Sequence, residues 1–481
     1  MVDLTPILPE IVMIIFAIVL PAIYLVTKND KVVAGISLAG IIIAMALTFQ
    51  YLWDGAPVMV FENLLEQDAF SALFKMVFLF VALYVVIASI RYVEKERHTA
   101  EYYSLIMLAT VGMMVVASAT DLITLFVGIE LTSLSSFALV GFRKRDKRGS
   151  EAATKYFIIG AFSSAISLYG ISLLYGTVQT TNIAEIGATI GSMTSLDSVA
   201  ILATVMLIAG FGFKVAVVPF HMWAPDVYEG APSTISAFLA AGSKKMGLVA
   251  LFKIFLIGLL AIKADWELAV GIIAIVTMTV GNVMAVNQTN IKRMLAYSSI
   301  AQAGYILIVL PIATDYALTG GIFHIITHAF MKGGAFLIVG ALSLSALGEN
   351  ISDYKGLAKR APLIALGMGI LMFALAGIPP LSGFASKVVL FSSAVDISVI
   401  PQYNWMIWLA IAGVINSALS LYYYARVVKY MYVEKGPEEK LKIPTSMAVA
   451  IAICVVATVV IGIYPEPIIQ ACETAATAFF A

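Results

Sequence analysis

The stretch GFGFKVAVVPFHMWAPDVYEGAPS (residues 210–233) places Lys214 in an otherwise apolar segment that Pro219 interrupts. The whole chain has this apolar character. Of its 481 residues, 61% are hydrophobic and only 12% are charged, and the mean hydropathy is +0.98. These values lie far outside the range of soluble globular proteins. The sequence therefore predicts an integral membrane protein, in which a lysine at membrane depth is costly and indicates a function.

Apolar runs of about 18 to 25 residues recur along the chain, each long enough to cross the hydrocarbon core as a helix. They predict an all-α integral membrane protein with about fourteen transmembrane helices, because the alternating pattern of a membrane β-barrel is absent. No basic segment precedes the first run, so we expect this helix to be retained rather than cleaved as a signal peptide. The expected spans are 6–27, 32–53, 69–91, 101–119, 121–142, 151–176, 199–223, 232–262, 267–287, 294–313, 317–345, 362–397, 404–432 and 443–467.

The loop charges predict the orientation. Basic residues follow the odd-numbered helices and acidic residues follow the even-numbered ones, with Lys263 as an exception. By the positive-inside rule, we expect both termini to face outside, in the plasma membrane of a bacterium or archaeon. The basic positions are Lys28, Lys31, Arg91 to Arg97, 143–148, Lys292, Arg293, Lys355 to Arg360 and Arg426 to Lys442. The acidic positions are Asp54, Glu62, Glu66, Asp68, Glu185, Asp197, Asp315 and Asp396.

Five charged residues are predicted to lie inside transmembrane helices. They are Glu130, Lys214, Lys244, Lys332 and Lys387. Burying them costs on the order of 15 kcal/mol in total, so they must be paired, hydrated or neutral part of the time. The alternative to a functional role is a static internal ion pair. Lys245 follows Lys244, and only one of the two need face the interior, because neighbours on a helix point about 100° apart. Lys75, Lys155 and Lys253 lie nearer helix ends, where snorkelling to the surface explains a lysine.

Histidines mark two further positions. His324, His328 and Lys332 recur every four residues, so they share one face of the expected helix eleven and form a stripe suited to proton relay. Histidines one turn apart cannot bind a haem from opposite faces, and no Cys or carboxylate lies nearby at ligand spacing, so we expect no metal. His221 lies about two turns beyond Lys214 and either extends its path or satisfies freed backbone carbonyls.

Prolines and glycines interrupt two of the expected helices. Pro219 interrupts helix seven, and the segment 377–383 with Pro379 and Pro380 interrupts helix twelve. Broken helices at corresponding places are typical of inverted-repeat transporters. The two breaks lie near Lys214 and Lys387, about 170 residues apart, which suits two inverted five-helix repeats, helices four to eight and nine to thirteen. The expected segments are helices one to three (1–100), the first repeat (101–263), the second repeat (264–432), and helix fourteen with its tail (433–481).

The sequence contains few residues or motifs that could bind a redox cofactor or a nucleotide. Two cysteines, Cys454 and Cys472, cannot hold an iron–sulfur cluster, and glycine-rich nucleotide motifs are missing. If redox chemistry is involved, the electrons travel in another subunit. The net charge of zero gives no indication of nucleic acid binding.

Four stretches resemble the antiporter-like membrane subunits of complex I and its relatives, and the resemblance covers essentially the whole chain. DVYEGAP (226–232) and KYFIIGAFSSA (155–165) resemble subunit N of the NADH or F(420)H(2) dehydrogenase family more than its L and M sisters. The stretches are KVAVVPFHMWAPDVYEGAPS (214–233), EAATKYFIIGAFSSAISLYGISLLYG (151–176), NIKRMLAYSSIAQAGYILI (290–308) and LAGIPPLSGFASK (375–387).

The resemblance implies a proton channel across the membrane. Glu130 matches the family glutamate, Lys214 its partner, Lys244 the central lysine, Lys387 the lysine near the outer exit and Lys155 a further basic residue. It implies a non-redox subunit of a proton-translocating oxidoreductase that passes electrons to a quinone-type carrier, with NADH, F(420)H(2) or reduced ferredoxin as donor. No cofactor is expected on this chain.

The expected partners are the lipid bilayer, L-, M-, K-, J-, A- and H-like membrane subunits, and a peripheral redox arm with flavin and iron–sulfur clusters; no nucleic acid partner is expected. The alternatives are a cation/proton antiporter subunit of the multi-subunit Mrp type and a membrane subunit of an energy-converting hydrogenase.

Overall fold

The computed structural model describes residues 3–52, 57–94, 96–193 and 198–481. Asp54, Lys95 and Asp197, which belong to the loop-charge pattern, lie outside the described residues. In chain order the helices are α1 (Leu8–Thr27), α2 (Asp30–Phe49), α3 (Ala69–Tyr92), α4 (Thr99–Ser118), α5 (Leu122–Val140), α6 (Lys147–Val178), α7 (Ile183–Gly191), α8 (Ser198–Val215), α9 (Trp223–Gly230), α10 (Ser233–Phe238), α11 (Lys244–Lys253), α12 (Lys263–Val286), α13 (Ile291–Leu307), α14 (Val309–Ile312), α15 (Asp315–Leu344), α16 (Leu357–Arg360), α17 (Pro362–Ala376), α18 (Ser382–Ile397), α19 (Ile407–Tyr432), α20 (Thr445–Ile463) and α21 (Glu466–Phe480). Two short strands, β1 (Val58–Val60) and β2 (Leu65–Gln67), form an antiparallel hairpin.

The predicted all-α membrane protein is confirmed. Within the described residues, 13 helices are long and apolar enough to cross a membrane. The expected helix twelve is divided into α17 and α18, of 15 and 16 residues, so neither half alone reaches the length of a span. The fourteenth crossing, expected over 362–397, stays a prediction for α17 and α18 together.

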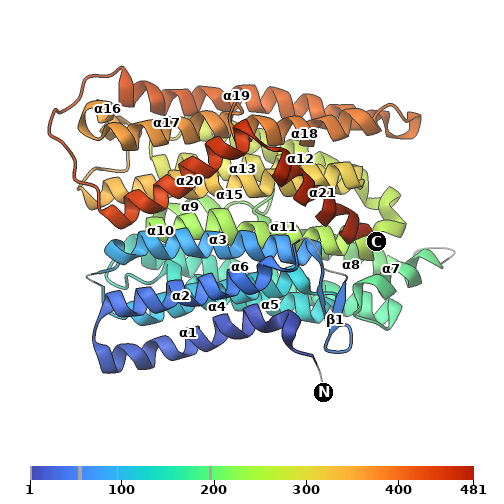
Figure 1. Cartoon of the computed structure of the whole chain (residues 1–481). Helices are drawn as coiled ribbons and strands as arrows, with labels where there is room; N and C mark the ends of the chain where they lie inside the picture. The colour runs from blue at the N-terminus through green and yellow to red at the C-terminus, as the bar shows by residue number, and fades with distance from the viewer. Residues whose placement is uncertain (1–2, 53–56, 95, 194–197) are drawn as a thin grey trace.

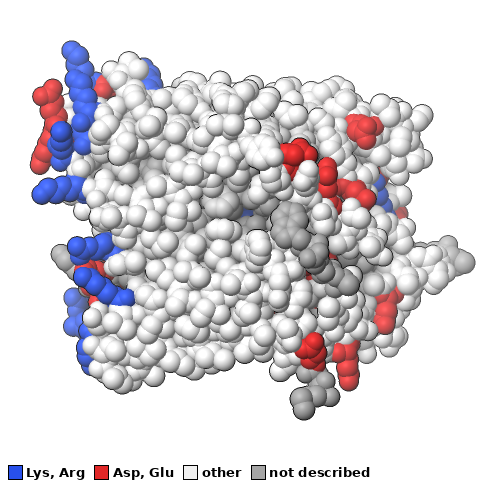
Figure 2. Space-filling model, viewed as in Figure 1, with Lys and Arg blue, Asp and Glu red and all other residues white. Residues whose placement is uncertain are grey.

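The helices run side by side along one common direction, and the charges separate toward its two ends (Figure 1). Lys and Arg gather at one end of the molecule, called here the basic end, and Asp and Glu predominate at the other, the acidic end (Figure 2). The surface between them is almost uncharged in this view, as a bilayer requires. Both termini lie toward the acidic end. Which side of the membrane each end faces stays a prediction.

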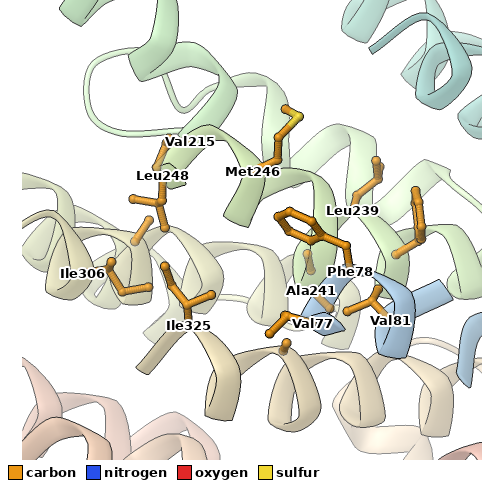
Figure 3. Packing of buried hydrophobic residues seen from close by; sticks show 14 of the residues in the cluster. Val77, Phe78, Val81, Val215, Leu239, Ala241, Met246, Leu248, Ile306 and Ile325 are labelled. Atoms are coloured by element: carbon orange, nitrogen blue, oxygen red, sulfur yellow. The ribbon is translucent and has the colours of Figure 1, made fainter. Parts of the chain in front are cut away.

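The centre of the bundle is formed by helices that are apolar all round. In the segments Ser233–Gly258, Ile291–Ile312 and Asp315–Leu344, more than nine-tenths of the most apolar 18-residue stretch is buried. Figure 3 shows this packing, with Val77 and Phe78 of α3, Leu248 of α11 and Ile325 of α15 in one continuous cluster. A polar side chain on these central helices is therefore out of reach of lipid.

The two halves of the bundle share an unusual backbone motif. Asp121 forms an isolated antiparallel bridge with Asn182, and Asn290 forms the same bridge with Asn350. Equivalent residues of the two bridges, Asp121 with Asn290 and Asn182 with Asn350, lie 169 and 168 positions apart, close to the predicted 170. The first bridge adjoins the β1–β2 hairpin near the acidic end, and the second lies close to α16 at the basic end (Figure 1). One motif at opposite ends is what an inverted repeat predicts.

Both predicted helix breaks are present. Helix α8 ends at Val215 and α17 ends at Ala376, and the next residue in each case has a positive φ, 57° at Ala216 and 89° at Gly377. These two residues are 161 positions apart, as are Pro219 and Pro380. Lys214 precedes its break, whereas Lys387 follows the second one. The four segment boundaries stay a prediction.

Candidate functional site

The predicted Glu130–Lys214 pair is present between α5 and α8. Lys214 Nζ lies 3.3 Å from Glu130 Oε1 and donates to Ser133 Oγ at 2.9 Å. Ser164 Oγ donates to the same Glu130 oxygen at 2.6 Å. The lysine side chain is 6% exposed and the glutamate side chain 24%, so the carboxylate borders the lateral surface of the bundle. The pair can therefore exchange a proton within itself or with a group that approaches from the side.

At the second break, Lys387 caps the end of a half-helix. Its Nζ donates to Leu375 O at 2.8 Å, to Ala376 O at 3.1 Å and to Ser417 Oγ at 2.9 Å. Because α17 stops at Ala376, these carbonyls have no helical partner, and their dipole favours a cation. Lys387 also lines a hollow of about 470 Å³ among α17, α18 and α19. Exposed Val388 and Val414 line it as well, so the hollow opens to the side of the bundle.

Both lysines of the pair 244–245 face the interior, which the sequence left open. A five-residue π-helical segment, Leu239–Ser243, comes immediately before them and interrupts the regular helix. Lys244 Nζ donates to Ser299 O at 3.0 Å. Lys245 is fully buried, and its Nζ has no hydrogen-bond partner among the described residues. An amine in that position requires water or a second buried group within reach.

The predicted stripe on α15 is buried along its whole length. His324, His328 and Lys332 all have no exposed surface, and the two imidazole rings lie 6.2 Å apart. In the part of the chain that the structure describes, neither ring nitrogen of His328 has a hydrogen-bond partner. Lys332 Nζ donates to Ser298 Oγ at 2.6 Å and to Leu295 O at 3.2 Å. His328 and Lys245 are thus two orphaned polar groups in the same core, where internal water would satisfy both.

A continuous chain of hydrogen bonds links this stripe to Lys387. His324 Nε2 donates to Gln302 Oε1 at 2.8 Å, which leaves Nδ1 to accept from Ser386 Oγ at 2.9 Å. The other end of the Gln302 amide, Nε2, donates to Leu375 O at 3.3 Å. Lys387 donates to that same carbonyl. Gln302 therefore connects His324 on α15 to the broken helix α17.

Two predicted residues lie apart from this chain. Lys155 is 44% exposed at the basic end, where its Nζ is 2.7 Å from Glu151 and 2.8 Å from Asp226. Burial raises the pKa of the Asp226 carboxyl, but hydrogen bonds from Lys155 and Arg293 outweigh it and hold the pKa below its usual value. His221 lies in the break after α8, half-buried, with its Nδ1 unpartnered among the described residues. Neither residue forms a hydrogen bond with Lys214.

The snorkelling interpretation is wrong for Lys75 and Lys253. Lys75 has no exposed surface and forms an ion pair with Glu10, and Lys253 is 5% exposed and donates to Ala119 O at 2.9 Å. Both lysines lie near helix ends in sequence, but their side chains point into the bundle, where a partner helix replaces the solvent. Position along a helix does not reveal which face a side chain occupies.

Sequence reasoning missed the uncharged members of the site. Ser133 and Ser164 hold the Glu130–Lys214 pair, and Gln302, Ser386 and Ser417 connect or hold the groups of the second half. Gln302 could have been found, because an amide inside the apolar stretch IAQAGYILI is unusual at membrane depth. Serines give no such signal, since they are common in membrane helices.

The fold and the site together define a class of protein. A bundle of membrane-spanning helices with two broken helices, and a row of buried lysines and histidines between them, is typical of proteins that move ions across a bilayer. Within the described residues, no group of three or more His, Cys, Asp or Glu side chains is placed to hold a metal ion.

Comparison with known proteins gives the family. Residues 119–420 match the family described as NADH:quinone oxidoreductase/Mrp antiporter, TM. The chain is 47% identical to F(420)H(2) dehydrogenase subunit N of Methanosarcina mazei, over 97% of each chain. It is 40% identical to NADH-quinone oxidoreductase subunit N of Trichlorobacter lovleyi, over 98% of this chain and 97% of the relative. The chain therefore belongs to the NADH:quinone oxidoreductase/Mrp antiporter membrane-subunit family.

Solved structures agree with this assignment. A chain of respiratory complex I from Thermus thermophilus is 26% identical, with a TM-score of 0.80 over 96% of this chain and 99% of that one. A chain of the Mrp complex from Dietzia sp. matches with a TM-score of 0.88 over 99% and 98%. The latter is 22% identical, so this likeness shows the fold alone.

Proposed function

We propose that this chain is the proton-translocating membrane-arm subunit N of a complex I-like respiratory dehydrogenase. The relatives named subunit N, which match it nearly end to end, support the place in such a complex. The buried chain from His324 through Gln302 and Leu375 O to Lys387 is the observation that carries the proton-translocating role. It joins two titratable groups, His324 and Lys387, through unbroken hydrogen bonds inside the bundle.

The first step belongs to the Glu130–Lys214 pair. A carboxylate beside a buried lysine favours the charged amine, and removal of that carboxylate leaves desolvation to favour the neutral amine. Movement of Glu130 toward or away from Lys214 therefore loads or releases a proton. The 24% exposure of Glu130 allows a neighbouring charge to drive that movement from the side.

From Lys214 the proton passes to the central groups and on to Lys387. Lys244 and Lys245 lie in the centre of the bundle, and the unpartnered Lys245 and His328 mark the hydrated part of the path. The neutral His324 both donates and accepts, so it can pass a proton by exchanging tautomers. Lys387 receives the proton at the second break, and the hollow beside it gives access to the exit.

Each proton that crosses against a membrane potential requires about 2.3 kcal/mol per 100 mV. This work comes from electron transfer to a quinone-type carrier in partner subunits that hold flavin and iron–sulfur clusters. The coupling reaches this chain through the row of buried charges, and the proposed partners are L-, M-, K-, J-, A- and H-like membrane subunits and a peripheral redox arm. The positive-inside rule supports both termini outside the plasma membrane.

Purification of the native complex under mild detergent tests the assignment. Copurifying subunits that contain flavin and iron–sulfur clusters are the expected result, and they would name the electron donor. A complex of membrane subunits alone would contradict the dehydrogenase assignment and favour the Mrp-type antiporter or, with a hydrogenase centre, the energy-converting hydrogenase.

A further inference from the structure

A second buried carboxylate–lysine pair lies toward the acidic end, outside the residues that match the family. Lys75 Nζ on α3 is 2.7 Å from Glu10 Oε1 on α1, and the two side chains are 0% and 8% exposed. Lys75 also donates to Gln67 Oε1. The second carboxylate oxygen, Glu10 Oε2, is buried without a hydrogen-bond partner among the described residues. A static ion pair is stable in a bundle core when every oxygen is satisfied, and this one is not.

Lys253 is a further buried lysine, on which the charge of Lys75 acts. It lies on α11, eight positions after Lys245, which is roughly 12 Å along the helix axis. Its Nζ donates to Ala119 O and lies 5.6 Å from the centre of the Phe70 ring. The titratable groups close enough to act on Lys253 are Asp68, Glu66 and Lys75. Lys253 is thus the next basic group from Lys245 toward the acidic end.

The carboxylates at the acidic end differ in whether a hydrogen bond to the backbone already engages them. Asp68 is engaged as the cap of α3, where it accepts from Ser71 N–H at 2.7 Å. Burial raises the pKa of Glu66, the charge of Asp68 raises it further, and Lys253 opposes both. Glu66 and Glu10 are therefore the two carboxylates placed to take a proton.

We propose that Glu10 and Lys75, reached through Lys253, form a second proton-exchange site that opens toward the acidic end. The direction of flow through it rests on the proposed function, but the exchange itself does not. An N–H bond of the Lys75 ammonium breaks and an O–H bond forms on Glu10, which leaves a neutral amine and a neutral carboxyl. The carboxyl then releases its proton to water at the acidic end, the Lys75 amine takes a new proton from the Lys253 ammonium, and the neutral Lys253 amine is reprotonated from the buried lysines at the centre of the bundle.

Chemical labelling of the whole complex in its own membranes tests this exchange. Dicyclohexylcarbodiimide enters apolar regions and reacts with protonated carboxyl groups, and mass spectrometry of the peptides measures the adduct at Glu10 and at Glu130. We expect the adduct at Glu10 to rise several-fold during electron transfer over the resting complex. Glu10→Gln must abolish it. Lys75→Met removes the ion-pair partner of Glu10, and burial without a partner favours a neutral carboxyl. This variant should therefore be labelled at rest, which shows that the reagent reaches the site.

The outcomes separate the inference from the proposed function. Turnover-dependent labelling of Glu130 with constant, low labelling of Glu10 would overturn the second site and leave the proposed function standing. Labelling of Glu10 alone would support the second site and contradict the role of Glu130. No turnover-dependent labelling at either carboxylate, while Lys75→Met is labelled, would contradict both.

The connection through Lys253 has its own test. Lys253→Met should lower the number of protons pumped per electron transferred, at unchanged assembly. The matched control is Lys263→Met, because Lys263 at the same end also has a carboxylate partner, Glu267 at 3.6 Å, and a backbone carbonyl partner, Ile312 O at 3.0 Å. An unchanged pumping ratio in Lys253→Met would exclude Lys253 from the path.

Discussion

At the scale of single residues, the charged members of the site could be predicted and their uncharged partners could not. Glu130, Lys214 and Lys387 stand out because each charge interrupts an apolar run. The serines and Gln302 hold these charges through hydrogen bonds between helices that are distant in the sequence. The sequence contains the residues but not the register in which the helices meet.

Gln302 offers a test of the hydrogen-bonded chain. Replacement by Met should destabilise the subunit by about 1 to 3 kcal/mol, because His324 Nε2 then loses its buried acceptor. The number of protons pumped per electron should fall by a larger fraction than the amount of assembled complex. The measurement is the pumping ratio of purified complex in liposomes, with Gln179→Met, at an exposed position, as the control. An unchanged ratio in Gln302→Met would remove His324 and Gln302 from the path.

Asp226 tests the electrostatics of the basic end. It pairs with Lys155 at 2.8 Å and with Arg293 at 2.7 Å, and its pKa is lowered in the folded protein. A lowered carboxyl pKa stabilises the fold above the unfolded value of about 4 and loses that contribution as the pH falls through the folded pKa.

Asp226→Asn should therefore cost about 1 kcal/mol at pH 7, a modest amount because solvent screens these partly exposed pairs. The difference in thermal unfolding temperature from the wild type should shrink as the pH falls below about 4 and disappear once the pH is below the folded pKa. Asp396→Asn, at an exposed position, is the control. A difference that persists unchanged in acid would show that the ion pairs are not its source.

At the scale of elements, the breaks that follow α8 and α17 could be predicted because proline and glycine disrupt helices in any context. The π-helical segment before Lys244 could not, since its sequence LAAGS contains no proline and a single glycine is tolerated inside a helix. Gly242 in this segment would bring a Cβ to 3.2 Å from Met113 Sδ, so close packing against α4 accompanies the segment. Such irregularities depend on tertiary contacts.

Gly377 is the element-scale test. Its φ of 89° disfavours a side chain, and an added Cβ would lie 3.2 Å from Lys387 Cδ. Gly377→Ala should cost about 1 to 2 kcal/mol and displace Lys387 from the end of α17. Thermal unfolding and pumping measure the two effects. Gly369→Ala is the matched control within α17, where the new Cβ meets only Tyr432 at 3.9 Å. Equal behaviour of the two variants would contradict the role of the break.

At the scale of the whole molecule, the composition and the length of the apolar runs were sufficient to predict the all-α membrane bundle. The positive-inside rule predicts that the basic end faces the cytoplasm. A cysteine introduced at Lys144 should react with a membrane-impermeant maleimide only in inside-out vesicles, and one at Glu185 only in right-side-out vesicles. The native Cys454 and Cys472 are buried and should stay unreactive. The opposite pattern would invert the topology.

We propose that the Glu130–Lys214 pair carries protons during electron transfer. The most direct test of this proposal is the number of protons pumped per electron in complexes that carry Glu130→Gln or Lys214→Ala, at a normal electron flux. The control is Glu151→Gln, whose carboxylate is 67% exposed at the basic end. We expect the ratio of protons pumped per electron to fall sharply in Glu130→Gln and Lys214→Ala and to stay unchanged in the control. A wild-type ratio in Glu130→Gln and Lys214→Ala would contradict the proposal.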